Sequence, residues 1–186
     1  TMLIRTFASA VMGIDAVTVT IEVNVSRGIR FFLVGLPDSA VKESQQRIES
    51  SLRSLGYHWP GKQVLINMAP ADIRKEGSAY DLPLAVGIMA ASNQIKTDLL
   101  EKFVMMGELS LDGGMKPIRG ALPIAVKARE AGFKGLHKLS FIVTHQDQSV
   151  DKLCRYFVVR IVDSLVSVDD SPCNINIMIC PDGCVR

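Results

Sequence analysis

Residues 56–63 have the glycine and lysine spacing of a phosphate-binding loop. In such a loop the residue after the lysine is Ser or Thr, whose hydroxyl binds Mg²⁺, but here it is Gln63. The loop should also leave a strand and open a helix, so that helix N–H groups meet the phosphate. Here we expect a helix to end at Gly56 and a strand to begin at Lys62, and Pro60 has no N–H to donate. We therefore expect no ATP binding at this stretch.

The cysteines lie late in the chain, where they could hold a metal ion. The candidate ligands are Cys154, Cys173, Cys180 and Cys184, with His145 as an alternative to Cys154. Structural zinc sites favour two short pairs of the Cys-x2-Cys kind, whereas only Cys180 and Cys184 are close neighbours in sequence. We therefore expect no metal and no other cofactor in this chain.

A short charged run at residues 74–76 is the best candidate for an interaction surface. The candidate surface consists of Arg74, Lys75, Glu76, Lys116 and Arg119, and Arg47 and Arg53 could extend it. One interpretation is a solvated loop. The other is contact with nucleic-acid phosphate, with a neighbouring subunit or with an attached ATPase ring, and salt should weaken phosphate contacts.

The composition is that of a single soluble domain with a substantial core. The 186 residues are 48% hydrophobic and 22% charged, with a net charge of +2. This balance predicts neither nucleic-acid nor membrane binding. No apolar run reaches the roughly 18–20 residues of a membrane helix, and the N-terminus lacks the pattern of a signal peptide. We therefore expect a cytoplasmic protein with no membrane partner.

The first third of the chain is rich in predicted strands. Apolar residues fall on every second position of residues 16–25, which places them on one face of a strand. We expect further strands at residues 3–11, 30–34 and 62–67. Between the last two, Asp38 or Ser39 can cap a helix that ends at Gly56; its buried stripe is Val41, Ile48, Leu52 and Leu55.

Helices and strands alternate after that point. Asp81 can cap a second helix, which continues through Met89 and is apolar on most sides, so we expect it inside the core. Residues 103–109 and 115–118 predict a hairpin around an Asp-Gly-Gly turn. Residues 122–131 predict a third helix, ended by Gly132. This order favours an α+β fold over a doubly wound parallel sheet.

The composition changes after residue 136. Alanine and glutamate become rare, cysteines appear, and β-prone runs remain at residues 139–143 and 156–162. We therefore divide the chain into a domain at residues 1–136 and a divergent tail at residues 137–186. A truncated or frame-shifted reading and a lineage-specific extension both explain the tail.

Three stretches carry a family resemblance: residues 34–44, 67–83 and 107–120. In this order they resemble the N-terminal domain of the ComM/YifB family of magnesium-chelatase-related AAA+ ATPases, from Met2 to Leu136. The resemblance implies a Lon protease-like fold of the ribosomal protein S5 domain 2 type. It also implies a separate AAA+ module that binds ATP and Mg²⁺, a hexameric assembly, and a role in DNA processing during natural transformation.

The resemblance to Lon raises the question of catalysis. Lon-type proteases use a Ser–Lys dyad, in which the lysine takes the proton of the attacking serine. The position that matches the serine holds Ala79, and the position that matches the lysine holds Leu122. Ser78 is one residue away from the nucleophile position, and a shift of one residue re-aims a side chain, so we interpret it as a loop or capping serine.

These observations together predict a non-catalytic interaction domain of a ComM/YifB-type ATPase. Its expected partners are the AAA+ module and further copies of the same protein. A Lon-like serine peptidase and a stand-alone DNA-binding module remain as alternatives.

Overall fold

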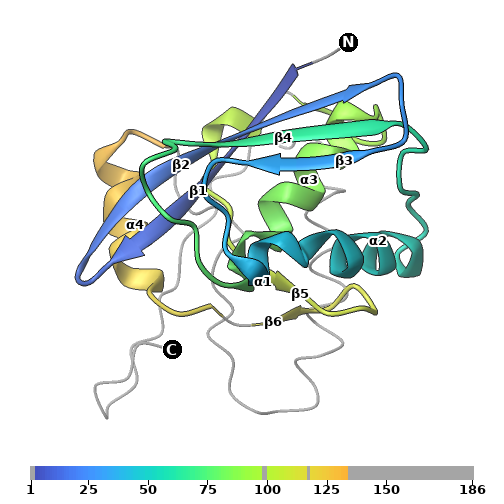
Figure 1. Ribbon diagram of the computed structural model, residues 1–186. Coiled ribbons are helices and arrows are strands. Elements are labelled where there is room, and N and C mark those ends of the chain that lie inside the picture. Colours follow the sequence, from blue (N-terminus) through green and yellow to red (C-terminus); the bar gives the residue numbers. More distant parts are fainter. Residues whose placement is uncertain (1–2, 98–99, 117, 134–186) are drawn as a thin grey trace.

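The computed structural model describes residues 3–97, 100–116 and 118–133 (Figure 1). The predicted tail at residues 137–186, its two β-prone runs and all the candidate metal ligands lie outside the described residues. The domain boundary at residue 136 therefore stays a prediction.

A four-stranded sheet forms one layer of the molecule, in the order β1-β2-β4-β3. Its strands are β1 (Leu3–Met12), β2 (Asp15–Ser26), β4 (Gln63–Ala69) and β3 (Phe31–Val34). β2 pairs antiparallel with β1 and β4, whereas β3 runs parallel to β4 at the edge. The four strands predicted from the sequence are confirmed, with ends that differ by at most two residues.

The alternation of apolar residues along these strands gives the sheet one buried face. On β2 every second residue from Val19 to Val25 is buried, and on β4 Val64, Ile66 and Met68 are buried. Paired residues in a sheet point to the same side, so these side chains form one continuous apolar surface. Helices cover this surface (Figure 1), whereas the other face is covered only in part, where Phe133 packs against Phe7 and Gly120 lies against Val11.

Four α-helices lie within the described residues. They are α1 (Ser39–Lys42), α2 (Ser44–Ser54), α3 (Asp81–Ala91) and α4 (Ala121–Glu130). Every residue of α3 is buried, because the helix lies between the sheet and a small hairpin, with α2 beside it (Figure 1). The prediction of a core helix here is confirmed. At Gly87 an added Cβ would lie 2.7 Å from Val23, so this helix packs closely on β2.

Two helix predictions need correction. The helix expected over residues 39–55 is divided at Glu43, whose N–H bonds back to both Ser39 and Val41. Asp38 caps α1 as expected, because its carboxylate accepts the N–H of Val41. Asp81, in contrast, does not cap α3: its carboxylate instead points to Arg47 and to the N–H of Leu109.

The hairpin is shorter than expected. It consists of β5 (Glu108–Leu109) and β6 (Met115–Lys116), which pair antiparallel. The residues before β5 do not continue this strand. One of them, Val104, instead forms an isolated parallel bridge with Phe7 of β1. The described part of the chain also has two short 3-10 helices, η1 (Ser78–Tyr80) before α3 and η2 (Leu100–Lys102) after it.

Candidate functional site

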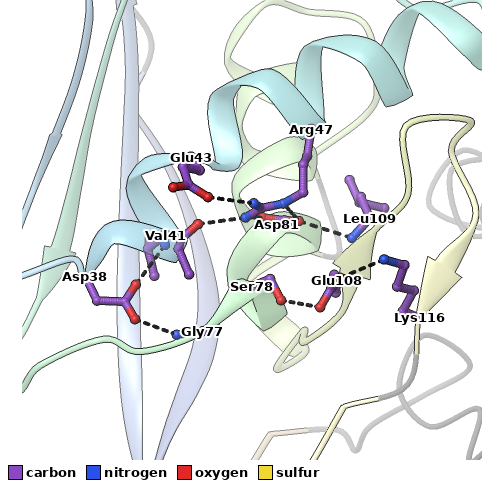
Figure 2. A network of polar contacts seen from close by, with 11 residues as sticks. Asp38, Val41, Glu43, Arg47, Gly77, Ser78, Asp81, Glu108, Leu109 and Lys116 are labelled. Atoms are coloured by element: carbon purple, nitrogen blue, oxygen red, sulfur yellow. Dashed lines mark hydrogen bonds and ion pairs between the residues drawn. The ribbon is translucent and has the colours of Figure 1, made fainter.

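The site lies where two loops meet beside the start of α3. The loop after β3 and the loop after β4 pair through their backbones: Lys75 donates its N–H to Leu36 (3.1 Å), and Asp38 donates its N–H to Lys75 (3.0 Å). The Asp38 carboxylate then accepts the N–H of Gly77 (3.0 Å) in addition to the N–H of Val41 (2.8 Å) (Figure 2). One side chain thus joins α1 to the segment that leads into η1.

The loop after β3 has an unusual backbone. Gly35 has a φ of +100°, and a Cβ at this position would lie 2.1 Å from the carbonyl oxygen of Met68. The next residue, Leu36, has a φ of +55°, a region that non-glycine residues seldom occupy. The loop therefore needs glycine where it passes close to β4. This close contact sets the path of the chain toward Asp38.

Arg47 and Asp81 form the central ion pair of the site. Arg47 Nε lies 2.7 Å from Asp81 Oδ2, and a second guanidinium nitrogen lies 2.9 Å from Oδ1. The same guanidinium donates to the carbonyl of Ala40, and the N–H of Leu109 donates to Asp81 (Figure 2). Burial raises the pKa of Asp81, an effect that Arg47 and Leu109 oppose. The pair connects α2, α3 and β5.

A second polar chain joins η1 to the hairpin. The Ser78 hydroxyl donates to one oxygen of Glu108, and Lys116 Nζ lies 3.0 Å from the other oxygen (Figure 2). The hydroxyl of Ser78, followed by the charge of Lys116, lowers the pKa of Glu108 although partial burial raises it. A carboxylate held in this way stays ionised and is a weak proton acceptor.

The two positions that match the Lon dyad hold hydrocarbon side chains. Ala79 lies in η1 with a half-buried methyl group, and its backbone carbonyl accepts the N–H of Gly107 (2.7 Å). Leu122 lies on α4 with 59% of its surface exposed. Neither group can attack a carbonyl or accept a proton.

The structure places four members of the expected interaction surface at the surface and one inside the domain. Arg74, Glu76, Lys116 and Arg119 are exposed. Arg74 and Glu76 form an ion pair with each other (3.2 Å), whereas Lys116 is held by Glu108. The inclusion of Lys75 was wrong: its side chain is 0% exposed, because its backbone pairs with the Leu36–Asp38 segment and its amine turns inward onto the carbonyl of Pro70. Burial lowers the pKa of this amine.

Sequence reasoning missed the roles of Arg47 and Glu108 in this network, and the second contact of Asp38, with Gly77. One signal was available, because Asp81 is the only charged residue in an otherwise apolar core helix, and a buried carboxylate needs a cationic partner. Which cation would reach it depends on the fold. Across residues 3–97, 100–116 and 118–133, no cluster of three or more His, Cys, Asp or Glu side chains could hold a metal ion. In the same ranges no helix has the length and apolar character to cross a bilayer.

The sequence of the chain matches those of known proteins. The model of the family described as subunit ChlI of Mg-chelatase matches residues 21–145. The chain belongs to this family. It is 40% identical over 126 residues to YifB of Escherichia coli and 42% identical over 126 residues to competence protein ComM of Haemophilus influenzae. Each match covers 67% of this chain and 25% of the relative, so the chain spans about a quarter of the length of these relatives.

A more distant relative bears on the fold. Lon protease 2 of Bacillus subtilis is 32% identical over 96 residues, which cover 52% of this chain and 17% of that protein. Membership of the ChlI family and this similarity confirm the expected ComM/YifB-type, Lon-like α+β domain.

Proposed function

We propose that this chain is a non-catalytic interaction domain that acts beside the AAA+ module of a ComM/YifB-type ATPase. The observation that carries the proposal is the pair of hydrocarbon side chains at Ala79 and Leu122, on a fold that is similar to a protease. Near Ala79, polar side chains bind one another and join the elements of the domain. A scaffold that has a protease-like fold without the reactive pair is suited to contact and regulation.

The relatives support a larger assembly. The matched relatives are about four times as long as their aligned segment, which leaves room for a separate ATPase module. ATP and Mg²⁺ would bind to that module, and a hexamer is the expected assembly. The name of the Haemophilus influenzae relative, competence protein ComM, links the proposal to DNA processing during natural transformation.

A serine peptidase is the second candidate, and one contact favours it. Ser78 lies next to the matched nucleophile position and donates its hydroxyl to Glu108, which could accept a proton. The lowered pKa of Glu108 weighs against this role, because a general base works best when its pKa lies near the working pH. Lys116 does not act as the lysine of a Ser–Lys dyad, because its amine donates to Glu108 and not to Ser78.

A peptidase assay separates the two candidates. We expect the chain to release no more fluorescence from dye-labelled casein than the Ser78→Ala variant does. A Lys116→Gln variant serves as a second control, because it alters the same contact chain without removing the hydroxyl. Cleavage by the wild type that disappears in Ser78→Ala would overturn the proposal in favour of the peptidase.

A chimera tests the accessory role. The segment of YifB that matches this chain is deleted, or replaced by residues 3–133 of this chain, and ATP hydrolysis and oligomeric size are measured. We expect the deletion to change the ATPase rate or the assembly, and the replacement to restore both toward the parent values. If the deletion leaves both unchanged, the domain has no accessory role in the motor.

A further inference from the structure

Three cations gather at the end of the sheet where β2 ends and β4 begins. Arg27 and Arg30 lie in the loop after β2, and Lys62 directly precedes β4. All three are exposed. We refer to Arg27, Arg30 and Lys62 as the basic sheet end.

Backbone pairing brings these residues together. Ser26 is paired with Gln63, and the N–H of Val64 donates to the carbonyl of Arg30 (2.9 Å). Gly28 lies against Gln63, since a Cβ built on it would be 3.0 Å from the Gln63 side chain. The residues that carry the three charges are therefore neighbours in space as a result of strand register, and not only in sequence.

The basic sheet end differs from the basic groups that form ion pairs at the surface. Elsewhere the pairs are Arg5 with Glu22, Arg53 with Glu49, Arg74 with Glu76, Lys116 with Glu108 and Lys127 with Glu130. Within the described ranges, Arg27, Arg30 and Lys62 have no carboxylate at ion-pair distance. Three unneutralised cations side by side repel one another and favour a bound anion.

An apolar row begins beside the basic sheet end, on the partly covered face of the sheet. Register places Phe32, Leu65, Asn24 and Leu3 in one line across all four strands. Phe32 is 40% exposed, although a large aromatic side chain is usually buried. α3 packs on the opposite face, against Thr6 and Val23, and Leu65 and Leu3 of the row are 41% and 52% exposed.

We propose that the basic sheet end and the adjacent apolar row bind single-stranded nucleic acid. Two guanidinium groups and an ammonium group would bind successive phosphates, for which arginine is well shaped. The exposed ring of Phe32 would stack on a base, with the aliphatic row beside it. A stacking ring next to a positively charged edge is the combination that single-strand binding surfaces use.

Other anionic partners fit the surface less well. A duplex hides the faces of its bases and would leave Phe32 unused. A membrane would take up Ile29, which is 91% exposed at the tip of the loop, but a single buried side chain of this size contributes only about 2 kcal/mol. An acidic peptide would use the cations without the ring.

The inference concerns this chain alone and does not depend on an ATPase module. Failure of the binding experiment below would leave the proposed accessory role intact, and failure of the YifB chimera would leave the nucleic-acid surface intact.

Fluorescence anisotropy with a fluorescein-labelled oligothymidine of about 16 nucleotides tests the proposal. The chain is titrated at several salt concentrations between about 50 and 200 mM. A triple variant, Arg27→Gln, Arg30→Gln and Lys62→Gln, should bind at least about tenfold more weakly at low salt. Its plot of log K against log salt should be shallower by about 2, because three phosphate contacts are lost.

The matched control removes the same charge elsewhere. The variant Lys42→Gln, Lys102→Gln and Arg129→Gln should keep wild-type affinity and salt dependence. Phe32→Ala should weaken binding about tenfold, whereas Val34→Ala, which removes a second exposed apolar side chain from the same strand, should have little effect. Circular dichroism and thermal unfolding confirm that each variant is folded.

Several results would overturn the proposal. They are the absence of oligothymidine binding by the wild type at low salt, an equal loss in both triple variants, and wild-type affinity in Phe32→Ala. Tighter binding of a duplex of the same length would also overturn it. The same holds if the chain binds anionic lipid vesicles and the basic-sheet-end variant loses this binding but still binds oligothymidine.

Discussion

Arg47 and Asp81 meet through two nitrogen–oxygen contacts of 2.7 and 2.9 Å, although they are 34 positions apart in the sequence. Asp81 has no exposed surface, whereas Arg47 is partly accessible from one side. The pair is the point at which α2, α3 and β5 are connected, so its loss should affect the whole domain.

Replacing Arg47 tests this role. In Arg47→Ala the buried carboxylate of Asp81 has no cationic partner, and we expect the free energy of unfolding to fall by about 3 kcal/mol or more. Arg53→Ala is the matched control, since it breaks the exposed pair with Glu49 and should cost less than about 1 kcal/mol. Urea unfolding measures both. Equal losses of unfolding free energy in the two variants would show that the central pair stabilises the domain no more than an exposed pair does.

The contact between Ser78 and Glu108 predicts that the stability of the fold falls in acid. The folded-state pKa of Glu108 is lowered, so its contribution to stability is present above its ordinary pKa of 4.5 and is lost as the pH falls through the lowered value. Because the Ser78 hydroxyl is the main cause, Ser78→Ala should raise the Glu108 pKa toward 4.5 and remove part of this acid dependence. Carboxyl chemical shifts in NMR follow the titration, and an unchanged Glu108 pKa in the variant would refute the assignment.

Lys75 predicts a second rise of stability with pH, in the alkaline range. Burial lowers its pKa in the folded state, so between that value and its ordinary pKa of 10.5 the unfolded chain binds more protons. Raising the pH through this window should therefore stabilise the fold. Lys75→Met keeps the length of the side chain and removes the charge, and its free energy of unfolding should lack this rise. Chemical denaturation of both proteins across the alkaline range provides the comparison, and parallel curves would contradict the prediction.

Replacement of two different glycines by alanine should destabilise the fold by different amounts. Gly35→Ala would place a Cβ 2.1 Å from the carbonyl oxygen of Met68, and we expect a loss of more than about 3 kcal/mol. Gly56 also has a positive φ, of +83°, but nothing lies within 4 Å of an added Cβ. Gly56→Ala should therefore cost only about 1 kcal/mol. Thermal unfolding of the two variants distinguishes them, and similar losses would mean that the crossing at Gly35 relaxes easily.

Much of the fold was predictable because its signals are local. The period of two along β2 and the capping carboxylate of Asp38 depend on neighbours in sequence, and both predictions were confirmed. The uniform apolarity of α3 likewise predicted a helix inside the core. The position of each strand in the sheet could not be derived in this way, because it depends on long-range pairing.

The polar site was harder to predict for the same reason. Whether Lys75 is exposed depends on its backbone pairing with a loop almost 40 residues earlier, and no local pattern signals that the amine turns inward. Asp81 was expected at a helix cap, but the approach of Arg47 from α2 provides a stronger, charged partner. Local sequence shows which partners a side chain can have, and the tertiary contacts decide which of them it binds.

The order of elements has a consequence for synthesis of the protein. The sheet is complete at Ala69, but the helix that covers its centre ends only at Ala91. At about 5–20 residues per second, a ribosome needs roughly one to four seconds to add the residues between these points. During that interval the nascent chain has all four strands and α2 but lacks α3, so the centre of the apolar face is uncovered and can bind a chaperone.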